Sequence, residues 1–236
     1  MNGGFSADQS LMNDAVDIEK LVFSYRPPKA VLQIEKLAIG KGAKVFLHGP
    51  SGSGKTTLLG ILAGVLKADQ GSVKILGHDL TRMSGPARDA LRGTHIGYIF
   101  QMFNLIPYLN VVENIVLPCR ANRERGQRLN NLPVERAAQG IAERLGIGSI
   151  TFEKVTDLSV GQQQRVATAR ALLGSPELII ADEPTSSLDE DQRQNFLDLL
   201  FAQCQQIGST LIFVSHDRRM MPLFDRAISL PEINGA

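Results

Sequence analysis

A glycine-rich segment near the N-terminal end places the strongest limit on what this chain can fold into. Residues 49–56 read Gly-Pro-Ser-Gly-Ser-Gly-Lys-Thr and match the pattern G-x-x-x-x-G-K-[ST] at every fixed position. The apolar pattern predicts a strand just before it, at residues 44–47, and a helix just after it, at residues 56–63. In that context the segment predicts a phosphate-binding loop, and the simpler alternative is a glycine-rich turn that only joins a strand to a helix.

Glycine is needed in such a loop for a physical reason. A backbone that wraps around a pyrophosphate must approach it without Cβ atoms and must point its N–H groups inward, beside the positive end of a helix dipole. Lys55 is then expected to reach the β- and γ-phosphates, and the Thr56 hydroxyl to ligate magnesium. The candidate ATP-binding residues of this segment are Gly49, Pro50, Ser51, Gly52, Ser53, Gly54, Lys55, Thr56 and Thr57.

A second segment supplies carboxylates. Residues 178–183 read Leu-Ile-Ile-Ala-Asp-Glu, an apolar strand that ends in two acids, at the edge where open α/β sheets bind ligands. Adjacent residues of a strand point to opposite faces, so different roles are expected for the two side chains. Asp182 is the candidate magnesium ligand, directly or through water, and Glu183 the candidate group that polarises the attacking water. The alternative is a pair of solvated acids in a turn before Pro184.

The rest of the chain alternates between strand and helix patterns. Aliphatic runs between residues 16 and 39, interrupted by Tyr-Arg-Pro-Pro at 25–28, predict two antiparallel strands and a turn. Further strands are expected at residues 71–77, 177–182 and 210–215, with helices at 84–91 and 190–206 and a mostly helical stretch at 110–173. This alternation predicts an α/β fold whose mainly parallel sheet is covered on both faces.

Composition argues against several classes of protein. The 25 basic and 24 acidic residues nearly cancel, so no bulk charge favours a nucleic-acid partner or an anionic membrane surface. The longest apolar runs, at 178–181 and 211–214, are far below the roughly 20 residues that a membrane-spanning helix needs. Cys119 and Cys204 lie far apart in the sequence, which predicts neither a disulfide framework nor a zinc site. Residues 1–15 lack the features of a secretory signal, so a flexible tail and a cytosolic chain are expected.

Three short segments complete an ordered set with the loop and the carboxylates. They are Leu-Ser-Val-Gly-Gln at 158–162, Ser-Leu-Asp at 187–189 and Ser-His-Asp at 215–217. With them the chain closely resembles the ABC ATPase family from about residue 16 to residue 230. The resemblance implies one ATPase domain at 16–236, with a P-loop NTPase core, an antiparallel N-terminal β-subdomain and a helical subdomain at about 102–172. It also implies ATP and Mg²⁺ as ligands.

The segment at 158–162 resembles the family signature, usually Leu-Ser-Gly-Gly-Gln. A serine hydroxyl and backbone amides at a helix N-terminus would form a second anion site, and two such sites in one chain suggest a head-to-tail pair of copies. In the family, the signature of one subunit caps ATP held by the other. The residues expected to make this contact are Ser159, Val160, Gly161 and Gln162. Val160 departs from the usual glycine, which would weaken the contact if that position required a positive φ.

Four more residues take roles from the resemblance. His216 resembles the switch histidine that contacts the γ-phosphate, and Gln101 the glutamine that joins magnesium and water to the helical subdomain. Asp189 resembles the residue that links the two active sites across the dimer, although Ser-Leu-Asp is also an ordinary helix N-cap. Tyr25 resembles the aromatic that stacks on adenine, or it is a core tyrosine. The family thus implies catalytic roles for Glu183, His216 and Gln101, and magnesium ligation by Thr56, Gln101 and Asp182.

Residues 95–118 are similar to the lipoprotein-release and macrolide-export branch of the family. In that branch the ATPase works with a separate membrane subunit that has few spanning helices. The resemblance therefore implies a homodimer bound to an integral membrane permease at the cytoplasmic face of the cell membrane, driving export or lipoprotein extraction rather than import, with no nucleic-acid partner. The apolar residues around Pro107 either line a groove for a helix of that partner or close the subdomain core; they are Phe103, Leu105, Ile106 and Tyr108.

Two other functions agree with a single short domain of this kind. One is a soluble ABC ATPase of iron–sulphur cluster assembly, which acts without a transporter. The other is a regulatory module that binds nucleotide without hydrolysing it, against which Glu183 and His216 argue because both resemble hydrolytic residues.

Overall fold

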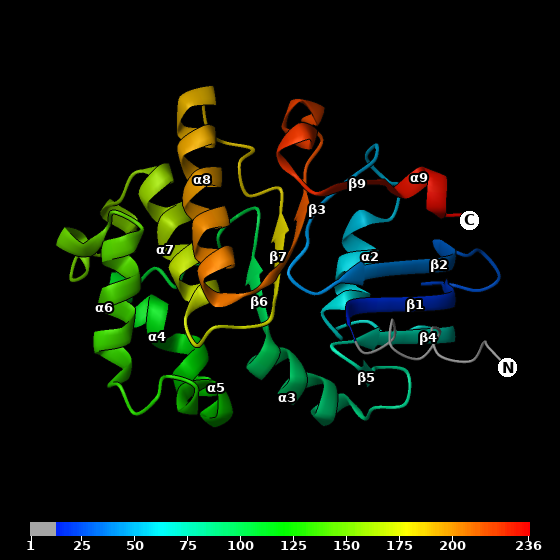
Figure 1. The fold of residues 1–236 in the computed structure, drawn as a ribbon, viewed down its shortest axis with the longest axis horizontal. Coiled ribbons are helices and arrows are strands. Elements are labelled where there is room, and N and C mark those ends of the chain that lie inside the picture. The colour runs from blue at the N-terminus through cyan, green and yellow to red at the C-terminus, as the bar shows by residue number, and fades with distance from the viewer. Residues whose placement is uncertain (1–12) are drawn as a thin grey trace, which may run out of the picture. The chain divides into compact units, whose positions relative to one another are not determined.

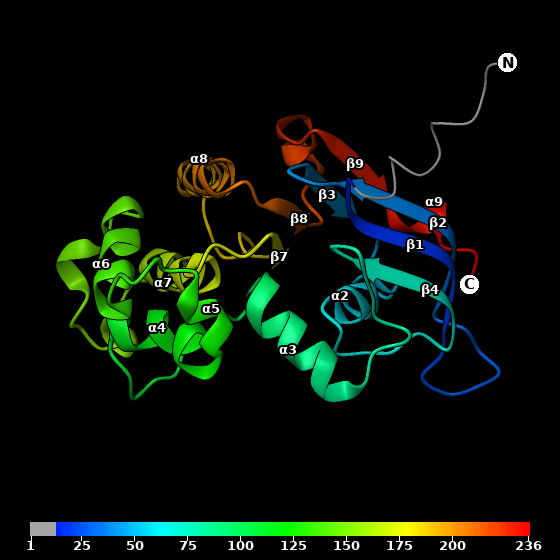
Figure 2. The ribbon, with the colours of Figure 1, turned by 60° about the horizontal axis from the view of Figure 1, so that its bottom comes forward.

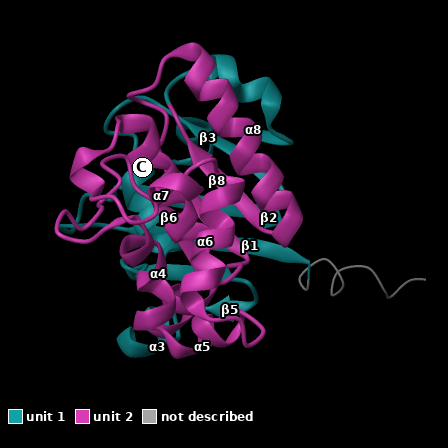
Figure 3. Cartoon of the chain, turned by 90° about the vertical axis from the view of Figure 1, so that its left-hand side faces the viewer, with its two compact units in different colours: residues 1–89, 216–236 teal, residues 90–215 magenta. Residues whose placement is uncertain are grey.

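A computed structural model describes residues 13–236 of the chain, which form two compact units (Figure 3). The first unit contains the described residues up to Asp89 together with residues 216–236, and the second contains residues 90–215. Within residues 13–236, no helix combines the length and the apolar character that a membrane crossing requires.

An antiparallel sheet dominates the first unit, with strand order β2-β1-β4-β5 (Figure 1). Its strands are β1 (Asp14–Phe23), β2 (Leu32–Gly40), β4 (Gln70–Ile75) and β5 (His78–Asp79). This confirms the antiparallel pair expected on either side of residues 25–28. β1 includes the last two residues of the expected tail, because Asp14 already pairs with Gly40 and Ala15 is fully buried. The earlier residues of that expected tail, 1–12, lie outside the described part of the chain.

The first unit also holds the strand, loop and helix expected around residues 49–56. β3 (Lys44–His48) pairs in parallel with β9 (Arg226–Ser229), and α2 (Lys55–Leu62) follows the loop. α2 buries its aliphatic face, including Leu58, Leu59 and Ile61, each at most 1% exposed. A 3₁₀ helix, η3 (Arg218–Leu223), and a short helix, α9 (Leu230–Ile233), lie before and after β9.

Three parallel strands form the centre of the second unit. They are β6 (Ile96–Ile99), β7 (Leu178–Asp182) and β8 (Thr210–Val214), with β7 in the middle. All side chains of β8 are buried, as expected of strands covered on both faces. The register pairs Ile99 with Ala181 and Asp182 with Val214, so the carboxyl ends of the three strands meet at one edge. The parallel strands expected at 177–182 and 210–215 are thereby confirmed.

Helices surround these strands. They are α3 (Gly85–His95), in which the division between the units falls, α4 (Val111–Ala121), α5 (Arg123–Gln127), α6 (Val134–Arg144), α7 (Val160–Leu172) and α8 (Glu190–Ile207). Figure 2 shows α4 to α7 as one helical group within the second unit. Two 3₁₀ turns, η1 (Gly148–Ile150) and η2 (Val155–Asp157), connect α6 to α7. A Cβ atom on Gly97 of β6 would lie 2.3 Å from the carbonyl oxygen of Ala171, so α7 rests directly on the strand backbone.

Candidate nucleotide-binding site

The loop at residues 49–54 has a backbone that other residues could not easily adopt. Gly52 and Gly54 have φ values of 81° and 96°, in the left-handed region that favours glycine. A Cβ atom on Gly54 would lie 2.8 Å from Leu32 Cδ2, and one on Gly49 would lie 2.7 Å from Ser53 Oγ. Gly54 is the N-cap of α2 and supplies no side chain to its first N–H groups. The helix therefore presents its positive end at a loop that a phosphate can approach closely.

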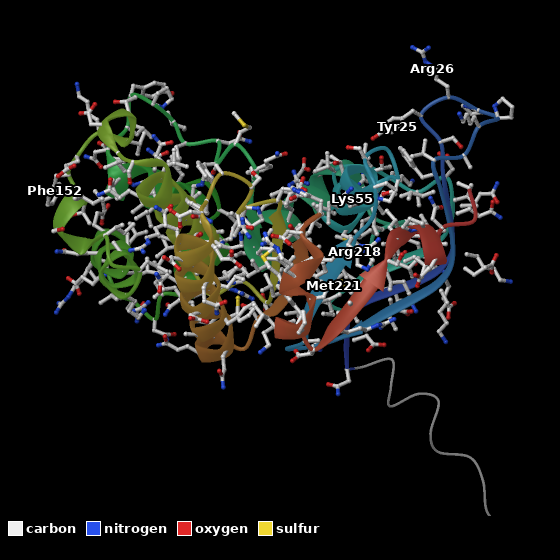
Figure 4. All side chains as sticks on the ribbon, turned by 90° about the horizontal axis from the view of Figure 1, so that it is seen from above. Tyr25, Arg26, Lys55, Phe152, Arg218 and Met221 are labelled. Carbon is white, nitrogen blue, oxygen red and sulfur yellow. The ribbon has the colours of Figure 1, made fainter. Side chains whose placement is uncertain are left out.

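Polar atoms of the loop also suit an anion. The Lys55 ammonium donates to the carbonyl oxygens of Gly49 and Pro50, at 2.8 and 3.0 Å, so its charge lies over the loop (Figure 4). Ser53 Oγ is buried and has no hydrogen-bond partner among the residues that the structure describes. Buried hydroxyls normally have a partner, and a phosphate oxygen would supply one here. The loop therefore fits a polyphosphate.

Tyr25 lies in the connection between β1 and β2, in the same unit as the loop. Its side chain is 60% exposed, which contradicts the core position considered from sequence. The ring packs edge-on against Phe23 at a centroid distance of 4.9 Å, and its hydroxyl lies 3.3 Å from Thr57 Oγ1 at the start of α2. The N–H of Ser24 donates to Asp69, which anchors the connection. Tyr25 thus presents an exposed aromatic ring beside the loop.

The two carboxylates differ in backbone conformation, which the strand pattern did not predict. β7 ends at Asp182, whereas Glu183 lies beyond the strand with φ of 48°, and its N–H donates to the carbonyl of Val214 at 3.0 Å. The expectation that strand alternation separates the two side chains is therefore wrong, because the backbone turns at Glu183. A non-glycine residue held there is strained by about 1–3 kcal/mol, and such strain is concentrated at functional sites.

Gln101 and Asp182 end up at the same edge of the parallel strands. Gln101 is exposed two residues beyond Ile99 of β6, and Asp182 ends the neighbouring strand β7. Burial, and then the negative charge of Asp182, raise the pKa of Tyr98, which therefore stays protonated beside this carboxylate. The register of the two strands thus places an exposed amide and a carboxylate at one edge of the sheet.

The signature segment forms a complete capping box. Ser159 is the N-cap of α7 and its Oγ accepts from the N–H of Gln162 at 3.3 Å, while Gln162 Oε1 accepts from the N–H of Ser159 at 2.8 Å. The spacing Ser-x-x-Gln is the sequence signal for this motif, which was not among the expectations from sequence. The cap uses a lone pair of the Ser159 hydroxyl and leaves its O–H available to donate to an anion.

Val160 and Gly161 begin the helix itself. Val160 is the first helical residue and its φ is not positive, so the expected weakness of a β-branched residue does not arise. A Cβ atom on Gly161 would have no atom within 4 Å, which leaves open space above the helix start. A pocket of about 370 Å³ lies there between α7 and the start of α8. Its lining is Ser159, Val160, Gly161, Gln162, Gln164, Arg165, Leu188, Gln192 and Phe196.

Asp189 and His216 are both exposed, but in different units. Asp189 Oδ1 accepts from the N–H of Gln192 at 2.8 Å and caps α8, which confirms the N-cap interpretation. His216 follows the buried residue Ser215 and comes two residues after the end of β8. It belongs to the unit that contains the phosphate loop.

One buried residue of this region was not found from sequence. Gln164 is 1% exposed, and its Nε2 donates to the carbonyl of Pro184 at 2.9 Å, directly after Glu183. α7 therefore holds the backbone at the exit of the carboxylate strand. A glutamine on a helix carries no signal of such a role, because its partner lies 20 residues away in the sequence.

The candidate residues divide between the two units. The loop, Tyr25 and His216 belong to the first, and Gln101, Asp182, Glu183, residues 159–162 and Asp189 to the second. In the part of the chain that is described, no group of three or more His, Cys, Asp or Glu residues is placed to hold a metal. Mg²⁺ does not need such a cage, because it commonly binds through one or two carboxylates, substrate phosphates and water. Thr56, exposed in the first unit, carries a hydroxyl oxygen, and Asp182, at the end of β7 in the second unit, carries carboxylate oxygens; each is a ligand of the type that Mg²⁺ prefers.

Comparisons with known proteins agree with this geometry. A family model described as ABC transporter matches residues 32–186. The uncharacterized ABC transporter ATP-binding protein YbbA of Escherichia coli is 40% identical over 206 residues, which are 87% of each chain. The lipoprotein-releasing system ATP-binding protein LolD of Hydrogenovibrio crunogenus is 37% identical over 189 residues, or 80% of each chain. A dimeric post-hydrolysis structure of the ATP-binding cassette MJ0796 with ADP and Pi superposes with a TM-score of 0.79, at 30% identity over 91% of this chain and 93% of that one.

Proposed function

Because this chain belongs to the ABC transporter family as an ATP-binding subunit and is an ATPase, we propose that two copies close around two ATP molecules and drive a separate membrane permease. One observation carries the proposal. The chain has a loop that suits a polyphosphate in one unit, and a second helix start with an available hydroxyl and an open pocket in the other. One bound nucleotide does not need two anion sites in the same chain, so the second site is proposed to contact the nucleotide bound by another copy. The dimeric state of MJ0796 supports this arrangement.

Each candidate residue then has a distinct task. The loop and Lys55 bind the β- and γ-phosphates, while Tyr25 stacks on the base. Thr56, Gln101 and Asp182 hold Mg²⁺, which when bound neutralises charge on the phosphates. Glu183 accepts a proton from the attacking water, and His216 orients that water toward the γ-phosphorus. From the second copy, Ser159 donates its O–H to the γ-phosphate, and residues 160–162 complete the contact, with Asp189 linking the two sites.

The membrane partner is proposed to be a permease of the lipoprotein-release and macrolide-export type. The similarity of residues 95–118 to that branch and the relationship to LolD support this choice over import. The ATPase would then lie at the cytoplasmic face of the membrane, held there by its partner, and would power export or the extraction of a lipid-anchored substrate.

Exposed apolar side chains in the second unit offer a surface for that partner. Met102 and Tyr108 are 81% and 80% exposed, whereas Phe103 between them is buried and closes the core. Phe152 is also exposed, at 80% (Figure 4). Its neighbour Thr151 accepts from the N–H of Val112 at the start of α4. Of the four apolar residues around Pro107, Phe103 packs inward, Leu105 and Ile106 are half-buried, and Tyr108 is exposed. Tyr108, together with the exposed Met102, is therefore the part of this segment proposed to receive a short helix of the permease.

A pair of variants tests the ATPase cycle. Lys55→Ala should abolish ATP binding, because the charge over the loop is lost. Glu183→Gln should still bind ATP and should accumulate as a dimer in size-exclusion chromatography with ATP. The two copies can still close around ATP, but the group that accepts the proton of the attacking water is absent. If Glu183→Gln hydrolysed ATP at the unmodified rate, the assignment of the base would be wrong.

The identity of the partner needs a separate experiment. The tagged chain should be purified from detergent-solubilised membranes and the bound protein identified by mass spectrometry. A permease with few spanning helices and a large extracytoplasmic domain is expected. Recovery of scaffold proteins of iron–sulphur assembly would favour that alternative function instead.

A further inference from the structure

Gln101 lies in a tight turn whose backbone is unusual. The N–H of Phe103 donates to the carbonyl of Phe100 at 3.0 Å, so Gln101 and Met102 are the central residues of a β-turn. The next two residues, Phe103 and Asn104, have φ values of 57° and 49°. Two consecutive non-glycine residues in the left-handed region are costly, and such a conformation persists only where surrounding groups hold it.

Arg170 is the group that holds it. Its Nη1 donates to the carbonyl of Asn104 at 2.7 Å, and its Nη2 donates to the carbonyl of Phe103. The planar guanidinium offers two parallel donors, and lysine could not reproduce this geometry. Arg170 is half-buried, and this burial lowers the pKa of its guanidinium. Both carbonyls of the left-handed pair are therefore bound by one side chain.

The position of Arg170 on α7 connects this turn to other parts of the second unit. Arg170 lies in the last turn of the helix, eleven residues after the N-cap Ser159, which is about 16 Å along the helix axis. Between them, Gln164 binds the carbonyl of Pro184. One helix thus begins at the signature residue, contacts the backbone beside Glu183, and ends on the turn that carries Gln101.

We propose that Arg170 is a positioning residue: it stabilises the left-handed pair Phe103–Asn104, and so keeps Gln101 at the strand edge where Asp182 lies. The importance of that position for hydrolysis rests on the proposed function. The bond between Arg170 and the turn does not. Because the helix that carries Ser159 also carries Arg170, a movement of its N-terminus would be transmitted to the Gln101 turn.

The test compares matched substitutions in the full chain. Arg170→Met keeps most of the alkyl stem and removes the donors. The control is Arg144→Met, on α6 of the same unit, whose guanidinium binds the side chain of Gln203 at 3.0 Å. For Arg170→Met we expect kcat for ATP to fall about tenfold, which corresponds to about 1.4 kcal/mol in the free energy of activation. KM should change less than about twofold, and the Mg²⁺ concentration for half-maximal rate should be higher. Arg144→Met should leave all three values unchanged.

A measurement that does not depend on ATP hydrolysis reports on the Gln101 turn alone. Hydrogen–deuterium exchange of the peptide that contains Phe103 and Asn104 should become about tenfold faster in Arg170→Met, with no change in peptides from α8. Asn104→Gly adopts the left-handed conformation without steric penalty. Combined with Arg170→Met, it should recover about threefold of the lost kcat.

The outcomes separate this proposal from the proposed function. If Gln101→Ala slows hydrolysis but Arg170→Met changes neither kcat nor exchange of the turn, the positioning role is overturned. Faster exchange throughout the second unit would also overturn it, because Arg170 would then be a general stability residue. If Gln101→Ala leaves kcat unchanged, the assigned role of Gln101 fails, and faster exchange confined to the turn would still support the structural link through Arg170.

Discussion

Ser159 has two tasks that substitutions can separate. Its hydroxyl accepts the N–H of Gln162 and caps α7, and under the proposed function its O–H donates to the γ-phosphate of the other copy. Aspartate is also a good N-cap, so Ser159→Asp keeps the cap and places a negative charge where the phosphate would bind. Ser159→Ala removes the cap and adds no charge. The two variants should therefore rank in opposite order for stability and for activity.

The surroundings of Ser159 determine how large the effects of these substitutions should be. Loss of an N-cap costs about 0.5–2 kcal/mol, and the lower half of this range applies because Ser159 is exposed and the Gln162 side chain still binds its N–H. Aspartate at this end adds about 0.3–1 kcal/mol of favourable interaction with the helix dipole. Against a phosphate about 4 Å away the same charge is unfavourable by up to about 4 kcal/mol, at an effective dielectric constant of about 20. We expect Ser159→Ala to slow ATP hydrolysis about tenfold, and Ser159→Asp to reduce it more than a hundredfold.

Stability is measured by urea unfolding and activity by phosphate release at high protein concentration. ATP-dependent dimerisation is measured with each variant in the Glu183→Gln background, where only the Ser159→Asp protein should remain fully monomeric. Wild-type hydrolysis by Ser159→Asp would show that no phosphate approaches the start of α7, and the reasoning would be refuted. Ser159→Asn is the control for charge: it keeps a capping oxygen, is neutral, and should lie between the other two in activity.

Three further experiments test separate parts of the structure. Gly97→Ala should lower the free energy of unfolding by about 1–3 kcal/mol in urea titration, because its Cβ would lie 2.3 Å from a backbone oxygen of α7, whereas Gly161→Ala, with open space, should not. Burial opposes ionisation of Glu177, but hydrogen bonds from Arg128 outweigh it and lower its pKa. The ionised Glu177 therefore stabilises the fold above pH 4.5, its usual pKa, and this contribution is lost as the pH falls through the lower folded value. Arg128→Ala should reduce that loss in urea midpoints measured against pH, because the Arg128 hydrogen bond is the largest cause that lowers the pKa. Tyr25→Ala should weaken ATP binding about tenfold by calorimetry, and Tyr25→Phe less than about twofold, if the ring stacks on the base.

Local patterns were sufficient for much of the fold. The pattern at residues 49–56 predicted the strand, loop and helix that the structure contains, because glycine positions and helix starts depend on backbone sterics within a few residues. The apolar runs at 178–181 and 211–214 predicted buried parallel strands at 177–182 and 210–215, because burial on both faces requires continuous apolar residues, and the structure has β7 and β8 there. The N-cap at Asp189 was also readable from three residues.

The signature needed both levels of information. Its resemblance to a known motif identified residues 158–162, and the Ser-x-x-Gln spacing is a local signal for the capping box that the structure contains. The consequence of Val160 depended on its backbone angle, which the tertiary structure supplied: φ is not positive, because Val160 is already inside the helix.

The residues that connect the segments of the candidate site could not be identified from the sequence. Gln164 binds the backbone 20 positions away and Arg170 binds it 66 and 67 positions away, and neither pair has a spacing that any local rule recognises. The left-handed backbone of Glu183 likewise depends on a hydrogen bond to the neighbouring strand β8. Short-range sterics and hydrophobic periodicity depend on residues that are close in the sequence, and they determine which elements form. Long-range hydrogen bonds exist only after those elements have packed, so the placement of Gln101 and Glu183 could be seen only in three dimensions.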